Sequence, residues 1–158
     1  MVAGVVALGA LLAGCGGGVE VSPSRTDGAL PAAERRACER LVDDLPDAVG
    51  DQPREEVSGN PLAAAWGDPP VVLRCGVGSP ADFTPLSTCQ EINGVLWFVP
   101  EGQITDQGAD VVATSMGSLP RVEVAVPAAL RPPQGILTDL SDALRAQGRT
   151  PDPDEPCS

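Results

Sequence analysis

The chain has 158 residues and a formal net charge of −12, and its ten basic residues are all arginine. This length fits a single domain, and so acidic a surface disfavours nucleic acid as a partner. The sequence contains no His, Lys or Tyr, which excludes Ser-His-Asp and Cys-His catalysis, a lysine Schiff base and a His-ligated metal site. We therefore expect no cofactor, no metal and no catalytic residue set.

An uncharged apolar run opens the chain and ends in Leu12-Ala13-Gly14-Cys15. Residues 2–13 are fewer than the roughly 20 needed to cross a membrane, and their number suits the apolar part of a signal peptide. The ending resembles the lipobox of bacterial lipoproteins, whose cysteine receives diacylglycerol and becomes the mature N-terminus. We expect residues 1–14 to be a signal peptide and Cys15 to be the lipid anchor. Ordinary secretion and a cytosolic location are the alternatives.

The rest of the chain divides by composition. Residues 15–33 are rich in Gly, Ser and Pro and predict a flexible, lipid-anchored tether. Residues 34–148 predict the folded domain, and residues 149–158 form an acidic, proline-rich tail. A helix is predicted between Pro31 and Pro46, and a short second helix from Asn60-Pro61 to Gly67.

Four β-rich segments follow, at residues 71–76, 95–99, 111–115 and 121–126. Residues 95–99 are apolar on both faces, which predicts a central strand, and the last two segments predict an antiparallel hairpin. A final amphipathic helix follows Pro132-Pro133 and ends at Gly148. The expected fold is α+β: an antiparallel sheet of about four strands, with two main helices packed on one face and disulfides stapling them.

Besides Cys15, four cysteines remain, namely Cys38, Cys75, Cys89 and Cys157. An even number in a small exported domain predicts two disulfides, with three possible connectivities. We favour Cys75–Cys89 and Cys38–Cys157, because a bridge to the first helix would hold down the polar tail. A four-thiolate zinc site is disfavoured, since no Cys-x-x-Cys pair occurs.

Arg74 and Trp66 are the candidate ligand-binding residues. Arg74 lies in the middle of a predicted strand. It could bind a carboxylate or another anion, or it could form a structural ion pair with Glu123, Glu56 or Asp68. We favour the ion pair. Trp66 could form a platform for a sugar or peptide, although a tryptophan among apolar residues is more often core. The same holds for Trp97.

Three blocks of sequence resemble one widespread actinobacterial family of small exported or membrane-anchored proteins. They are residues 65–76 (Ala-Trp-Gly-Asp-Pro-Pro-Val-Val-Leu-Arg-Cys-Gly), residues 93–98 (Asn-Gly-Val-Leu-Trp-Phe) and residues 124–127. Cys38 and Leu45-Pro46 extend the resemblance, which covers residues 38–144. The family is a domain of unknown function, so the resemblance implies location and fold but no catalytic residues.

The leader, the paired cysteines and the missing residue types predict a lipid-anchored protein on the extracytoplasmic face of the cell membrane. We expect a non-enzymatic binding or scaffold module for an envelope protein or a cell-wall ligand. The alternatives are a cell-wall enzyme that uses carboxylate or arginine chemistry and a carrier of a small ligand. Paired carboxylates such as Asp43 and Asp47, or Asp139 and Asp142, lie one helical turn apart, but nothing in their spacing predicts a cleft.

Overall fold

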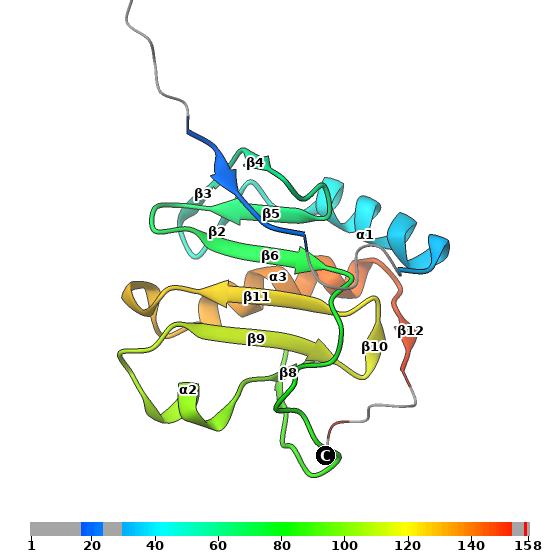
Figure 1. Ribbon diagram of the computed structural model, residues 1–158, viewed down its shortest axis with the longest axis vertical. Coiled ribbons are helices and arrows are strands. Elements are labelled where there is room, and N and C mark those ends of the chain that lie inside the picture. Colours follow the sequence, from blue (N-terminus) through cyan, green and yellow to red (C-terminus); the bar gives the residue numbers. More distant parts are fainter. Residues whose placement is uncertain (1–16, 24–29, 153–156, 158) are drawn as a thin grey trace, which may run out of the picture.

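The computed structural model describes residues 17–23, 30–152 and 157, and its centre is an eight-stranded antiparallel sheet (Figure 1). The strand order is β2-β3-β5-β6-β11-β9-β8-β7. These strands are β2 (Ala48–Val49), β3 (Gln52–Glu55), β5 (Ala63–Trp66), β6 (Val71–Cys75), β7 (Gln90–Ile92), β8 (Val95–Phe98), β9 (Val111–Met116) and β11 (Val122–Val126). Every neighbouring pair in this sheet is antiparallel.

Two thirteen-residue helices, α1 (Ala32–Asp44) and α3 (Gln134–Ala146), lie on one face of the sheet (Figure 1). Prolines precede both helices, where a missing N–H costs nothing. Their apolar stripes are Cys38, Leu41 and Leu45, and Ile136, Leu137, Leu140 and Leu144. A short helix α2 (Glu101–Thr105) connects β8 to β9, and a 3₁₀ turn η1 (Ala128–Leu130) connects β11 to α3.

The core lies between the two long helices and alternate residues of the strands. In β11, Val122, Val124 and Val126 are fully buried against the helices, whereas Glu123 and Ala125 are on the opposite face. This alternation follows from the period of two along a strand. Each buried valine, leucine or isoleucine contributes about 1.5–3 kcal/mol relative to exposure.

The expectation of about four strands and two helices is wrong, because the sheet has eight strands and the described residues contain three α-helices. The four predicted strand segments exist as β6, β8, β9 and β11, and the last two do pair antiparallel. The additional strands β3 and β7 carry mostly polar or half-exposed side chains, and β2 at the sheet edge has only two residues. Such strands lack the apolar pattern on which the prediction depended.

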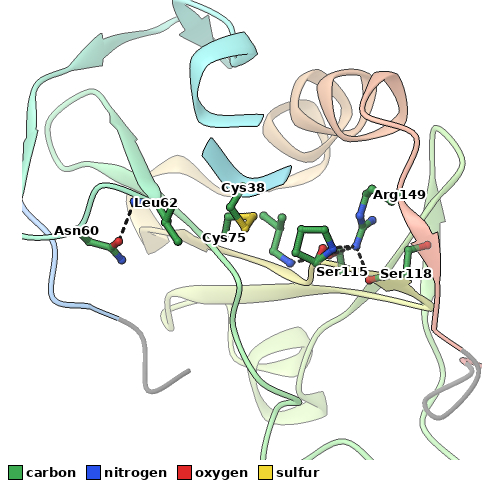
Figure 2. The surroundings of a disulfide bond; sticks show 9 residues. Cys38, Asn60, Leu62, Cys75, Ser115, Ser118 and Arg149 are labelled. Atoms are coloured by element: carbon green, nitrogen blue, oxygen red, sulfur yellow. Dashed lines mark hydrogen bonds between the residues drawn. A yellow bond between two sulfur atoms is a disulfide. The ribbon is translucent and has the colours of Figure 1, made fainter. Parts of the chain in front are cut away.

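The predicted helix from Asn60 to Gly67 is replaced by the strand β5. The side-chain oxygen of Asn60 accepts a hydrogen bond from the Leu62 backbone N–H at 2.9 Å, which turns the chain locally instead of starting a helix (Figure 2). All four residues of β5 are buried, and the strand pairs with β3 and β6. Three consecutive alanines favour a helix by propensity, and pairing on both sides overrides that preference here.

Strand β8 lies next to the edge strand β7 and not at the centre of the sheet. It is nevertheless covered on both faces. Trp97 packs into the core beneath α3, and Phe98 meets Phe83 edge-to-face with ring centroids 5.3 Å apart. Both faces of this strand are apolar because a helix covers one face and a loop covers the other.

Both favoured disulfide pairings are wrong, because the structure pairs Cys38 with Cys75 and Cys89 with Cys157. The Cα atoms are 5.5 Å and 5.6 Å apart, respectively. The first bridge joins α1 to β6 within the core (Figure 2). The second joins the loop before β7 to the chain near its C-terminal end, so the polar tail is attached to that loop and not to the first helix.

Two small sheets flank the main one. Strand β1 (Val19–Glu20) pairs in parallel with β4 (Val57–Ser58), and β10 (Ser118–Leu119) pairs antiparallel with β12 (Thr150–Pro151). The lipobox and Cys15 lie outside the described residues. Within the described part of the chain, no helix has the length and apolar character that a membrane span requires.

Candidate functional site

Arg74, the polar residue singled out by sequence, forms an ion pair with Glu123 on the sheet face opposite α1 and α3. The two residues are directly opposite each other on β6 and β11, and Arg74 Nη1 lies 3.2 Å from Glu123 Oε1. Their side chains are 26% and 30% exposed. The predicted cross-strand ion pair is therefore confirmed. Because the carboxylate already neutralises the guanidinium, this arrangement attracts an external anion only weakly.

Trp66 and Trp97 are both fully buried, which confirms that they are core residues. The Trp66 indole donates a hydrogen bond to the Pro46 carbonyl at 2.9 Å, and the Arg54 guanidinium lies 5.6 Å from the ring centroid. The Trp97 indole donates to the Ser141 hydroxyl at 3.0 Å. With no exposed ring, neither residue offers a surface platform for a sugar or peptide.

A cavity of about 240 Å³ lies elsewhere, between α1, the turn that follows β10 and the chain just after α3. Ala37 and Leu41 of α1 form one apolar wall, and Leu119 and Pro120 form another. Arg149 contributes a charged side chain to the lining. Elements from three distant parts of the sequence thus meet around one guanidinium.

Gly148 directs Arg149 into this position. Helix α3 ends at Ala146, and Gly148 adopts the left-handed conformation with φ of 59°. Glycine reaches this conformation without the penalty that a Cβ atom brings. The chain then reverses, and Thr150 pairs with Leu119. The predicted cap at Gly148 lies one residue beyond the observed C-cap, Gln147, and the left-handed conformation of Gly148 turns the next residue toward the sheet.

The guanidinium of Arg149 is held by oxygen atoms that carry no formal charge. Its Nη2 donates to the Ser115 hydroxyl at 2.9 Å, to the Ser118 carbonyl at 2.7 Å and to the Pro120 carbonyl at 3.0 Å (Figure 2). Its Nε is buried and has no hydrogen-bond partner among the described residues. No carboxylate of the described residues forms an ion pair with it, so its positive charge is not neutralised within this part of the chain.

Burial lowers the pKa of Arg149 to about 10, and the nearby positive charge of Arg121 acts in the same direction. Arg121 forms an ion pair with Asp152, which is itself buried. At neutral pH Arg149 remains protonated, and it is a desolvated cation. Such a group gains more from an incoming anion than an exposed arginine does, because less water screens the interaction.

Two charged residues of α1 also line the cavity, namely Glu34 and Arg40. They lie six residues apart in the helix, and Arg40 is exposed. The negative charge of Glu34 disfavours binding of an anion in the cavity, whereas the positive charge of Arg40 favours it. The described residues contain no cluster of three His, Cys, Asp or Glu side chains that could hold a metal ion.

Sequence analysis missed Arg149 because the domain boundary was placed after residue 148, which assigned this arginine to a solvated tail. One signal was available: Arg149 is the only basic residue after Arg145, directly before a run of prolines and acidic residues. Its burial depends on Ser115 and Pro120, which are about thirty residues away in the sequence.

These observations define the class: a small, mostly β domain built on an eight-stranded antiparallel sheet, with two disulfides and an arginine-lined cavity between its first helix and its C-terminal segment. The chain belongs to the family described as protein of unknown function (DUF3515), whose sequence model matches residues 1–151. This confirms the resemblance to a domain of unknown function. No curated protein and no solved structure matches the chain.

Proposed function

We propose that this protein is a lipid-anchored binding module on the outer face of the cytoplasmic membrane, and that its binding site is the Arg149 cavity. Cys15 of the lipobox is the proposed anchor. The diacyl group would supply two chains at about 0.8 kcal/mol per buried CH₂, which is enough for stable attachment.

The observation that carries the proposal is the pair of disulfides, one of which fixes the helix that forms a wall of this cavity. Cys38 lies on α1 between the lining residues Ala37 and Leu41 and is bonded to Cys75 of β6. The second disulfide joins Cys89 to Cys157, and neither residue lines the cavity. Disulfides form and persist outside the reducing cytoplasm. Their placement supports a binding site that is assembled in the extracytoplasmic compartment.

Binding is favoured over catalysis by the composition of the cavity. Among its lining residues, all within the described ranges, Glu34 is the one carboxylate. Hydrolysis of a glycoside by carboxylates needs two such groups about 5–9 Å apart. The lining also lacks a cysteine. Five of the eleven lining residues are polar or charged, and such a mixture suits a ligand that has both an apolar body and a charged group.

The proposal is tested by the intact mass of the protein extracted from its native membranes, with and without reductant. We expect a diacylglyceryl group on Cys15 and a gain of about four mass units on reduction, because two disulfides would take up four hydrogens. The matched control is Cys15→Ser, which should be absent from the membrane fraction and should still form both disulfides. An unmodified chain that starts at Met1 and has all five cysteines as free thiols would refute the lipid anchor and the extracytoplasmic location.

A further inference from the structure

The Arg149 cavity combines an arginine that has no ion-pair partner among the described residues with a lining that is about half apolar, and this combination restricts the ligand. Ala37, Leu41, Leu119 and Pro120 offer apolar contact, and the guanidinium lies among them. Guanidinium groups bind carboxylates and phosphates through parallel N–H···O bonds. Because Nη2 already donates to three oxygen atoms and Nε is buried, Nη1 is the donor of Arg149 that is left for a ligand.

Charge in the lining distinguishes a carboxylate from a phosphate. Glu34 shares the cavity with Arg149 and Arg40, so the net formal charge of these three side chains is +1. A monoanion is neutralised by this set, whereas a phosphate dianion is left with excess negative charge beside Glu34. Like charges at close range cost free energy, and burial increases that cost.

The size of the cavity limits the rest of the ligand. Its volume of about 240 Å³ is smaller than the roughly 300–1,000 Å³ typical of pockets for drug-sized molecules. The ligand that fits is therefore a small organic acid or the carboxyl-terminal end of a larger molecule, with an apolar body against α1 and Pro120.

We propose that the Arg149 cavity is a carboxylate-binding site for a small apolar acid. Arg149 binds the carboxylate, the positive charge of Arg40 strengthens this binding, and the negative charge of Glu34 disfavours dianions. This inference deepens the proposed function, because it names the ligand class of the same cavity. It does not depend on the lipid anchor, since binding can be measured on unanchored protein.

The experiment is a titration of the full chain carrying Cys15→Ser, with both disulfides formed, followed by NMR of the arginine Nε–H signals. The probes are benzoate and 4-methylpentanoate, with benzamide and inorganic phosphate as comparisons. We expect both acids to bind saturably and to shift the Arg149 Nε–H signal. Benzamide and phosphate should bind at least several-fold more weakly, because one lacks the charge and the other carries too much.

Two variants on α1 test the charges without touching the core. Arg40→Gln should weaken benzoate binding and Glu34→Gln should strengthen it, each roughly two- to fivefold, which is the range of a partly exposed charge interaction. The matched controls are Arg36→Gln and Glu39→Gln, which change the same charges on exposed positions of the same helix outside the cavity. The controls should leave binding unchanged.

Arg149→Lys completes the series. It keeps the charge but loses the planar group in which Nη2 binds the three protein oxygen atoms while Nη1 stays available to a ligand, so we expect a protein that stays folded and binds benzoate at least tenfold more weakly. The inference is overturned if the acids do not saturate, if benzamide or phosphate binds equally well, or if the control variants change affinity as much as the cavity variants. A failure of lipidation at Cys15 would refute the anchor and leave these binding results standing.

Discussion

Arg149 has a titration behaviour that follows from its surroundings. Its pKa is lowered to about 10, so below pH 10 it is protonated in both the folded and the unfolded chain, and the folded state carries the full cost of the buried charge. As the pH rises through about 10, the folded state loses this proton first. The contribution of Arg149 to the free energy of unfolding therefore becomes more favourable at alkaline pH.

A bound carboxylate interacts with the protonated form of Arg149, so ligand affinity has the opposite pH dependence. We expect benzoate affinity to be constant between about pH 7 and pH 9 and to fall above about pH 10. The other charged groups around the cavity are Glu34, Arg40, Arg121 and Asp152. Calorimetric titration across this range measures the effect, and an affinity that stays constant up to pH 11 would contradict it.

Ser141 is the second residue whose role can be tested alone. Its buried hydroxyl accepts a hydrogen bond from the Trp97 indole at 3.0 Å and donates to the Leu137 carbonyl at 2.6 Å. Ser141→Ala leaves the indole N–H buried without a partner, which costs about 1–3 kcal/mol.

Denaturant unfolding measures the loss in Ser141→Ala. The control is Thr138→Ala, which removes a hydroxyl from a half-buried position of the same helix and should change the free energy of unfolding by less than about 1 kcal/mol. Equal losses in the two variants would show that the indole hydrogen bond contributes nothing specific.

At the scale of elements, Arg54 of β3 forms hydrogen bonds with the C-terminal end of α1. Its Nη1 and Nη2 donate to the carbonyls of Leu45 and Val42 at 3.1 Å and 2.8 Å, and its guanidinium lies over the Trp66 ring. Helix α1 has no basic residue in its last turn. Arg54 therefore supplies the positive charge and the donors that the end of this helix lacks.

We expect Arg54→Met to lower the free energy of unfolding by about 1–3 kcal/mol, because two carbonyl acceptors lose charged donors. Arg54→Lys should recover only part of this, since an ammonium group cannot reproduce the guanidinium fork. Chemical denaturation provides the measurement, and Arg36→Met on the exposed side of α1 is the control. A lysine variant as stable as the native protein would rule out the fork as the reason.

At the scale of the whole molecule, the two disulfides differ in their accessibility. Cys38 and Cys75 are fully buried in the core, whereas Cys89 and Cys157 are partly exposed. Each closes a long loop, with sequence separations of 37 and 68. On the chain-entropy model each bridge contributes about 4 kcal/mol.

We expect a mild phosphine reductant to open Cys89–Cys157 first in the folded protein, because its sulfur atoms are within reach of solvent. Alkylation followed by peptide mass mapping should label Cys89 and Cys157 while Cys38 and Cys75 remain paired. Unfolding in denaturant is the control and should remove the difference. Labelling of Cys38 before Cys157 would contradict the burial seen here.

The fold was predictable from sequence wherever one residue pattern was enough. Alternating valines in β11 and the apolar stripe of α3 identify their elements. A structural ion pair at Arg74 followed from a charged residue in mid-strand, but only the structure selected Glu123 from the three candidate partners. Strands such as β3, with Gln52 and Pro53, were not predictable, because their pairing partners and not their own side chains determine their conformation. The disulfide pairs were not predictable either, since spacing leaves three connectivities open.

The sequence alone determined the residue types available for chemistry, the lipobox pattern and the positions of the strongly periodic elements, because these depend on composition or on neighbours a few residues apart. The tertiary structure alone decided that the sheet has eight strands, that Cys38 meets Cys75, and that Arg149 is buried beside Ser115 and Pro120. These contacts join residues tens of positions apart, and no local pattern encodes them. The cavity is made entirely of such contacts, and for that reason only the folded chain shows it.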